Sequence, residues 1–358
     1  MSKWAILLLS LTSAFSISGQ VDPVLLGPLP AAIDEASGLY CSSIDTCWTH
    51  NDDTDGARIY ALSGSGAFLE QRFISDAEQF DYESISGGPG DWLIGDFGNN
   101  GNERTDLTIY RFTDPRTTED DILPSTSISF HMEDQTAFPP APSQWNFDLE
   151  AMVHTESDIL LFTRNRTTPY NGITKVYRLN TDEAEQTAML IGSFLTSGTN
   201  PSSAITGAAL DTDEDRLALC SAEGLYVYDS FHVDETDFND YEFIPFISSR
   251  SYEGIDWVDG CTVRLITEGA LDGSLYELDL CTIGLEEEGS EGTPIEIVDG
   301  LIYYSGTNDI DLTLYGLDGR QLRTSFNGIL STSGLPSGIY LLRINASSSQ
   351  RCITIFQP

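Results

Sequence analysis

Five equivalent positions in a repeated sequence pattern carry the side chains best suited to chemistry. The pattern is a compact apolar segment preceded by small or acidic residues, and it occurs five times along the chain. At the aligned position it supplies two hydroxyl groups and three carboxylates, from Ser37, Glu83, Glu150, Thr206 and Glu253. If these side chains face one point, burial and mutual repulsion prevent all three carboxylates from staying charged and unpaired.

Two interpretations of these five positions follow from their chemistry. Carboxylate and hydroxyl oxygens are ligands of Ca²⁺, which accepts six to eight oxygens in flexible geometry. A calcium ion held by all five residues would therefore resolve the repulsion. The alternative is a structural network, in which each glutamate pairs with backbone amides or with an arginine.

The elements that position these residues are predicted by a second recurring feature, an aromatic strand after each copy of the pattern. The strand tyrosines lie 50, 67, 49 and 50 residues apart, at Tyr60, Tyr110, Tyr177, Tyr226 and Tyr276. A period near 50 residues with several short strands per unit is typical of a β-propeller. The sequence thus predicts an all-β fold in which residues 20–282 form a five-bladed β-propeller. The first strand of each blade lines a central channel, where the five aligned residues would meet.

The last predicted blade has no fourth strand of its own after Leu278. We expect the segment 24–27 to supply that strand and to close the ring, which removes the exposed strand edges.

One face of the predicted disc collects polar residues from the ends of the second strands. These candidates for a ligand-binding face are His50, Asp52, Asp96, Asn99, Arg164 and Glu268. Polar groups that converge from several blades would form a ligand site. Ordinary turn residues at strand ends are the alternative for each of them.

The charge balance restricts the partners of this chain. Its 358 residues include 56 acidic and 17 basic side chains, with a net charge of −39. Such a surface repels nucleic acids and anionic lipid headgroups. It suits a protein that works in salt or in divalent cations, because counterions screen the self-repulsion.

The two ends of the chain predict export. Residues 1–19 have the basic, apolar and small-residue regions of a signal peptide, and no other segment is apolar enough for a transmembrane helix. An acidic linker is expected at 283–294, followed at 295–358 by a small Ig-like β-sandwich with alternating strands and Asp-Gly turns. Six cysteines suit an oxidising compartment, and we expect disulfides Cys41–Cys47 and Cys261–Cys281.

The C-terminal segment resembles the C-terminal sorting domain of type IX secretion cargo. The resemblance is carried by Leu-Tyr-Gly-Leu-Asp-Gly-Arg at 314–320 and by Leu-Pro-Ser-Gly-Ile-Tyr at 335–340. Gly316 replaces the usual acidic residue, and the lysines common near the end of that family are absent. The resemblance implies that the type IX machinery recognises residues 295–358 and delivers the protein, through the periplasm, to the exterior or the cell surface.

The propeller segment resembles two further families. Residues 48–52 and 95–100 are similar to exported propellers of the SdiA-regulated group. The order Ser-Glu-Glu-Thr-Glu at the aligned positions resembles, more distantly, the calcium channel of five-bladed calcium-activated nucleotidases, or apyrases. The loop 51–56 is also similar to a loop of that family but lacks its arginine.

Two functions therefore stay open. The first is a binding module for an unknown extracellular ligand, with calcium in the central channel. The second is a calcium-dependent hydrolase of nucleotide, phosphate or ester substrates, in which the ion acts as a Lewis acid. The sequence assigns no catalytic residue, because no nucleophile, base or phosphate-binding cluster can be recognised. We prefer the binding module for that reason.

Overall fold

The chain divides into two compact units, Met1–Leu285 and Glu286–Pro358, and the division falls inside the predicted linker. In the first unit the computed structural model describes residues 20–88, 90–211, 215–234, 237–269 and 272–280. In the second it describes residues 295–298, 301–304, 310–315, 321–325, 329–336, 338–346 and 349–357. The predicted signal peptide at 1–19 and the linker at 283–294 lie outside the described residues.

The described strands of the first unit form five groups of four antiparallel strands. Four of them follow the chain order: β2 (Ala36–Ser43), β3 (Thr46–Asn51), β4 (Arg58–Ser63) and β5 (Phe68–Ser75); β6 (Tyr82–Ser86), β7 (Asp91–Asp96), β8 (Thr108–Thr113) and β9 (Ile122–Met132); β10 (Asp148–His154), β11 (Asp158–Arg164), β12 (Ile173–Asn180) and β13 (Glu185–Leu195); β14 (Gly207–Asp211), β15 (Arg216–Ser221), β16 (Gly224–Tyr228) and β17 (Glu242–Pro245). The fifth contains β18 (Tyr252–Trp257), β19 (Thr262–Thr267), β20 (Ser274–Asp279) and β1 (Val24–Pro28). Parallel pairing of β9 with β5 and with β13 joins three of these groups into one twelve-stranded sheet. Short 3₁₀ turns lie at Pro115–Thr117, Pro142–Gln144 and Pro201–Ser203.

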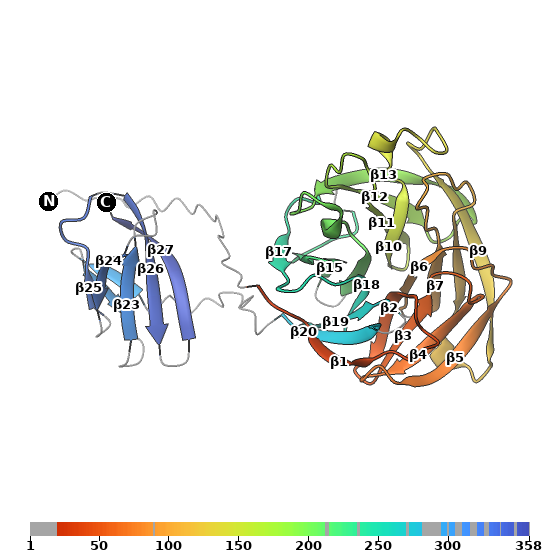
Figure 1. Ribbon diagram of the computed structural model, residues 1–358, viewed down its shortest axis with the longest axis horizontal. Coiled ribbons are helices and arrows are strands. Elements are labelled where there is room, and N and C mark those ends of the chain that lie inside the picture. The colour runs from red at the N-terminus through yellow and green to blue at the C-terminus, as the bar shows by residue number, and fades with distance from the viewer. Residues whose placement is uncertain are drawn as a thin grey trace. The chain divides into compact units, whose positions relative to one another are not determined.

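The sheets are arranged in a ring around their first strands. Strands β2, β6, β10, β14 and β18 contact one another in cyclic order, and β18 returns to β2. Figure 1 shows β6, β10 and β18 toward the middle of this unit, whereas β5, β9 and β13 lie at its rim. Sheets that radiate from a ring of first strands form a β-propeller. The predicted all-β propeller fold is therefore confirmed.

The burial of each strand follows its place in the sheet. All six residues of the first strand β18 are buried, because this strand is covered on both faces. The outer strand β9 alternates instead between buried and exposed residues, with one face on the core and one in solvent. Apolar residues of neighbouring sheets pack together, so the core consists of layers between sheets.

The ring closes through the N-terminal strand, as the sequence predicts for residues 24–27. Strand β1 pairs antiparallel with β20, and Val24 lies opposite Glu277. Leu26 packs against an apolar cluster that combines Leu39 and Tyr60 of the first sheet with Leu275 of the fifth. The first and last described strands of the unit are thereby joined in one sheet.

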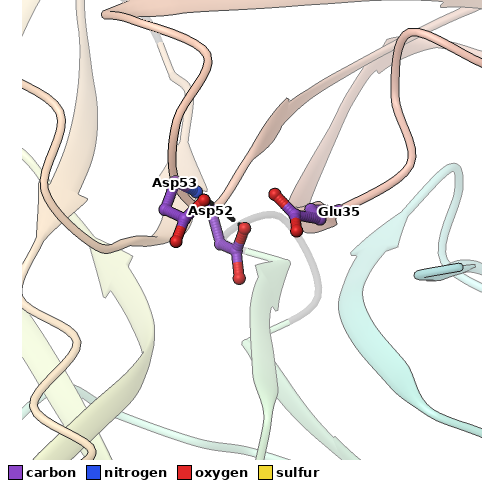
Figure 2. Close-up of side chains that lie close together, drawn as sticks. All are labelled: Glu35, Asp52 and Asp53. Atoms are coloured by element: carbon purple, nitrogen blue, oxygen red, sulfur yellow. Dashed lines mark hydrogen bonds between the residues drawn. The ribbon is translucent and has the colours of Figure 1, made fainter.

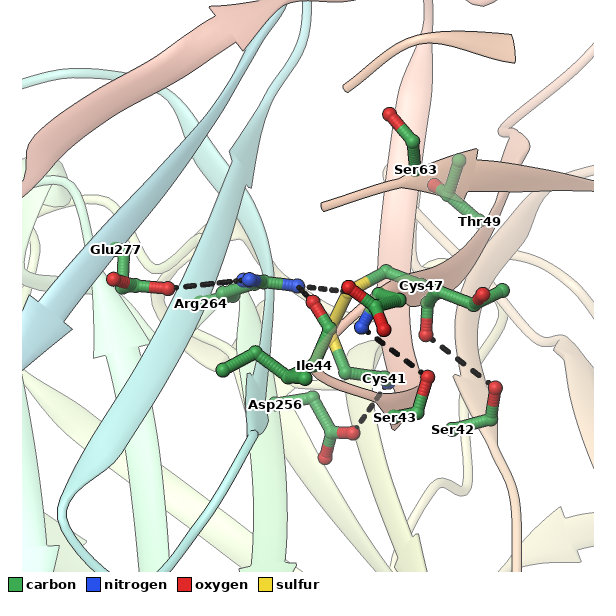
Figure 3. The surroundings of a disulfide bond; sticks show 12 residues. Cys41, Ser42, Ser43, Ile44, Cys47, Thr49, Ser63, Asp256, Arg264 and Glu277 are labelled. Atoms are coloured by element: carbon green, nitrogen blue, oxygen red, sulfur yellow. Dashed lines mark hydrogen bonds and ion pairs between the residues drawn. A yellow bond between two sulfur atoms is a disulfide. The ribbon is translucent and has the colours of Figure 1, made fainter. Parts of the chain in front are cut away.

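The predicted disulfide Cys41–Cys47 is confirmed and joins β2 to β3 (Figure 3). Its surroundings connect the first and fifth sheets as well. Arg264 of β19 donates to the carbonyl oxygen of Ile44 at 2.8 Å and contacts the Cys47 sulfur at 3.5 Å. The second predicted disulfide includes Cys281, which lies outside the described residues, so that pairing stays a prediction.

The described residues of the second unit form two sheets with a shared apolar core. One contains β21 (Ile295–Val298), β22 (Leu301–Tyr304) and β25 (Ile329–Ser331), and the other β24 (Gln321–Ser325), β23 (Ile310–Tyr315), β26 (Gly338–Ala346) and β27 (Ser349–Gln357). Both sheets contribute to the core, through Ile302, Leu312, Leu314, Leu330, Tyr340 and Leu342. The Gly-Leu-Asp-Gly-Arg turn at 316–320 lies outside the described residues. Among the described residues no helix is long and apolar enough to span a membrane.

Closure by β1 can be tested with adjacent substitutions. Leu26→Asp places a charge against the cluster between the first and fifth sheets, so we expect the free energy of unfolding to fall by about 2 kcal/mol or more. Leu25→Asp is the matched control, because Leu25 is 57% exposed, and it should change stability by no more than about 0.5 kcal/mol. Urea denaturation measures both. Equal effects of the two substitutions would contradict closure through β1.

Candidate functional site

The three channel glutamates are placed by the same backbone irregularity. The register between the first and second strands shifts between Tyr82 and Ser84, between Leu149 and Ala151, and between Tyr252 and Gly254. Glu83, Glu150 and Glu253 are therefore the extra residues of three β-bulges. A bulge leaves a residue outside the ladder and redirects its side chain. This accounts for the common orientation of the three carboxylates toward the interior of the ring.

Glu83 and Glu150 meet in a buried carboxylate cluster whose third member is Asp148. One carboxylate oxygen from each of the three lies within 4.8 Å of the others, and all three residues are buried. Ser37 joins the cluster, since its hydroxyl lies 3.3 Å from Oε2 of Glu83 and 3.2 Å from the Glu83 carbonyl oxygen. The structure thus brings together Ser37, Glu83 and Glu150, as the repeat pattern predicts. This arrangement by itself does not show a metal.

Two arginines at the end of β11 and just beyond it partly neutralise the cluster. Arg166 lies 3.0 Å from Oε1 of Glu150 and also pairs with Asp148. Arg164 lies 3.2 Å from Oε2 of Glu150 and 3.6 Å from Oε2 of Glu253, so it links these two glutamates. Among the described residues, no arginine or lysine lies within ion-pair distance of Glu83. The compensation of charge is therefore uneven around the ring.

The pKa values of these groups reflect both burial and crowding. Burial raises the pKa of Glu83 well above its ordinary value, and the charge of Glu150 raises it further. Burial also raises the pKa of Glu150, although Arg164 opposes this effect. The pKa of Glu253 rises to about 7 and that of Asp81 to about 6, in both cases mainly through burial. Protons are thus one way in which the protein can relieve the excess negative charge.

The hydroxyl of Thr206 forms a hydrogen bond to the neighbouring sheet. The residue precedes β14, and its Oγ1 donates to the carbonyl oxygen of Tyr252 at 2.5 Å. It also lies 3.8 Å from the sulfur of Cys220. The structure thus places Thr206 next to the strand that carries Glu253, with its hydroxyl proton already donated.

A second group of carboxylates lies where β2 begins and β3 ends. Oxygens of Glu35, Asp52 and Asp53 lie within 4.8 Å of one another, and Figure 2 shows the three side chains gathered there. Burial and the neighbouring Asp52 raise the pKa of Glu35 to about 7. These groups are more exposed than the channel cluster, so solvent screens their repulsion better.

The six candidates for the ligand-binding face fall into two sets. The first set is Asp52, Arg164 and Glu268. Burial raises the pKa of Glu268 above its ordinary value, and the nearby charges of Asp52 and Arg164 also act on this pKa. The remaining three candidates, His50, Asp96 and Asn99, are almost completely buried.

Each of the three buried candidates contacts the protein itself. His50 donates from Nδ1 to the carbonyl oxygen of Asn51 at 3.1 Å, and burial lowers its pKa to about 4. Asp96 pairs with Arg104 at 3.1 Å. Asn99 donates its backbone N–H to Asp148 at 2.6 Å, and its side-chain oxygen accepts from the backbone of Glu103 and Arg104. These contacts hold the loop after β7 against the cluster.

Sequence reasoning missed Asp81, Asp148 and Arg166. A signal was available, because an acidic residue lies two positions before the aligned residue in three repeats, at Glu35, Asp81 and Asp148. Arg166 had no such signal, since it lies beyond the end of a strand and reaches the cluster through the path of the following loop.

The opposite end of the channel is a cavity of about 670 Å³. All five first strands contribute to its wall near their C-terminal ends, through Tyr40, Ile85, Val153, Ala209 and Trp257. The cluster and this cavity therefore lie on one axis of the ring, close to opposite ends of the first strands.

Comparisons with known proteins give no family for this chain. No family model matches it, and no curated protein matches its sequence. Among solved structures, it is similar to the PQQ-bound aldose sugar dehydrogenase of Streptomyces coelicolor, with a TM-score of 0.44 and 10% identity over 71% of this chain and 96% of that one. It is also similar to the major Malassezia sympodialis allergen Mala s 1, with a TM-score of 0.41 and 10% identity over 74% and 84% of the two chains. These similarities are too distant to transfer any activity.

The raised pKa of Glu253 predicts a pH-dependent stability. Its ordinary value is 4.5 and its value in the fold is about 7, so the folded protein keeps a proton there that the unfolded chain releases. This contribution is complete below pH 4.5 and is lost as the pH rises to about 7, a change of at most about 3 kcal/mol. In chelator, Glu253→Gln should flatten the decline of unfolding free energy across this window. Glu156→Gln, at an exposed position, is the control. A Glu253→Gln profile parallel to wild type would contradict the assignment.

Proposed function

We propose that the five sheets are the blades of a five-bladed propeller and that this protein is an exported binding protein with a calcium ion in its central channel. The observation that supports calcium most directly is the buried contact among Glu83, Asp148 and Glu150. Burying like charges without compensation is unfavourable, and a divalent cation removes both the repulsion and part of the desolvation cost.

The local charge balance favours a cation as the missing partner. Among the described residues, two arginines pair with the channel carboxylates, whereas five carboxyl groups interact there: Asp81, Glu83, Asp148, Glu150 and Glu253. The proposed ligands are Glu83, Asp148 and Glu150, together with the hydroxyl of Ser37. Glu253 pairs with Arg164, and the Thr206 hydroxyl donates to the Tyr252 carbonyl oxygen. These two residues therefore support the site without binding the ion directly.

A binding role is better supported than hydrolysis. The alternative, a calcium-dependent hydrolase of nucleotide, phosphate or ester substrates, requires cationic groups that neutralise a polyanion at the ion. Arg164 and Arg166, the arginines nearest the cluster, are both paired with carboxylates. The cluster also lies below the surface, where a large substrate would need to displace these pairs.

We further propose that residues 295–358 form an Ig-like sorting domain for the type IX machinery, which delivers the protein to the exterior or the cell surface. Support comes from the sequence motifs and from the two sheets that share a core around Tyr340 and Leu342. The division of the chain between Leu285 and Glu286 is consistent with a separable address.

The calcium proposal predicts a thermal shift that depends on one carboxylate. An ion that binds only the folded state at 100 times its Kd adds about 2.7 kcal/mol of stability, which corresponds to a Tm increase of roughly 5–10 °C. We expect this increase in wild type on adding CaCl₂ and its loss with chelator. Glu83→Gln should abolish most of it, because the amide keeps a possible ligand oxygen but removes the negative charge that the ion would neutralise.

Glu35→Gln is the matched control, since Glu35 belongs to the second carboxylate group, and it should keep the full shift. The proposal fails if the Tm of the wild-type protein does not change when CaCl₂ is added. It also fails if Glu35→Gln rather than Glu83→Gln removes the response, because the ion would then bind near Asp52 and Asp53.

The export proposal predicts that removal of residues 295–358 leaves the propeller unit in the periplasm of a host with type IX machinery. Fractionation and immunoblotting measure the distribution, with the full chain as the control. Fusion of residues 295–358 to an unrelated periplasmic reporter should carry that reporter outside. Normal secretion of the truncated chain would contradict this role.

A further inference from the structure

A pocket of about 380 Å³ lies beside the acidic end of the channel and is separate from the carboxylate cluster. Its wall combines the end of β11, the 3₁₀ turn before β14 and the segment that leads into β18. Two arginines, Arg164 and Arg250, contribute to this wall. Basic side chains are scarce in the whole chain, 17 among 358 residues, so two in one small pocket are a local exception.

Arg250 differs from most arginines of the propeller in having no acidic partner. No carboxylate of the described residues lies within ion-pair distance of its guanidinium, whereas Arg164 is paired with Glu150 and Glu253. The guanidinium of Arg250 lies 5.4 Å from the centre of the Tyr276 ring, a cation–π contact that orients it without neutralising it. The Arg250 side chain also interacts with the Tyr252 hydroxyl, so its remaining N–H donors are the ones that can serve a ligand.

The pocket as a whole carries a positive balance. Glu253 is its acidic lining residue, and this carboxyl group already faces Arg164 at 3.6 Å. An anion in the pocket would meet two guanidinium groups and one carboxyl group. The excess of acidic residues in the chain repels anions, so two guanidinium groups in one pocket give an anionic group a favourable partner there.

Hydroxyl groups surround the same pocket. Ser202, Ser249 and Ser251 contribute to its lining. A guanidinium presents paired N–H donors that match the two oxygens of a carboxylate, and serine hydroxyls both donate to and accept from ligand hydroxyls. A singly charged carboxylate is also repelled less by the acidic surroundings than a phosphate dianion.

We propose that this pocket binds a small hydroxycarboxylate, with its carboxylate on Arg250 and its hydroxyls among the serines. This binding does not depend on the calcium ion of the proposed function, because none of the proposed calcium ligands is needed to hold Arg250. The pocket gives the binding protein a ligand class that neither the acidic composition nor the channel cluster indicates.

Isothermal titration calorimetry with D-gluconate tests the proposal on the full chain, freed of calcium with chelator and then dialysed into chelator-free buffer of moderate salt. We expect saturable binding of D-gluconate and none of D-glucitol, which has the same hydroxyl-bearing chain without the carboxylate. Arg250→Gln should weaken gluconate binding by roughly tenfold or more, the usual effect of losing a charged hydrogen bond. Arg250→Lys keeps the charge but not the paired donors and should fall between the two.

Arg58→Gln is the control for net charge, because Arg58 pairs with Asp55 and does not line the pocket. It should bind gluconate as wild type does. The proposal is overturned if wild type does not bind gluconate, if glucitol binds equally well, or if Arg250→Gln and Arg58→Gln have the same effect. Binding of inorganic phosphate in place of gluconate would also overturn the assignment to carboxylates. Because calcium is absent throughout, none of these outcomes bears on the calcium proposal.

Discussion

The repulsion among carboxylates buried on the axis of the ring is the constraint on which the rest of this structure depends. A ring of sheets brings the first strand of every repeat to one axis, so any residue type repeated at one position is concentrated there. In this chain that residue is glutamate in three of the five repeats. The fold that creates the channel thus also creates an electrostatic cost, and the surrounding residues are arranged to reduce it.

The compensation of negative charge differs between Glu150 and Glu83, and this difference bears on which of them would need a cation. Glu150 contacts both Arg164 and Arg166, so most of its charge is offset within the protein. Glu83 has the hydroxyl of Ser37 as its polar contact and depends on a proton or a cation. A structural network around Glu150 and a cation site at Glu83 are therefore compatible. The two interpretations left open by the sequence therefore do not exclude each other within one cluster.

The sequence predicted the repeated strands well because the same two patterns recur in each of the five repeats. The aromatic strands, the closing strand β1 and the disulfide Cys41–Cys47 all follow from spacing and local chemistry. The convergence of Ser37, Glu83 and Glu150 follows as well. The bulges that direct the glutamates inward were not predictable, since a bulge is a property of pairing between two strands. Arg166 and the burial of His50 and Asn99 depend on loop paths that no periodicity encodes.

The most direct test is the position of a calcium ion in the protein itself. Crystals grown with saturating CaCl₂ and measured at a long wavelength would reveal calcium by its anomalous scattering. We expect one strong peak about 2.3–2.6 Å from carboxylate oxygens of Glu83, Asp148 and Glu150. Absence of a peak at this cluster, or a peak confined to Glu35, Asp52 and Asp53, would show that protons and arginines alone compensate the channel, and would contradict the account.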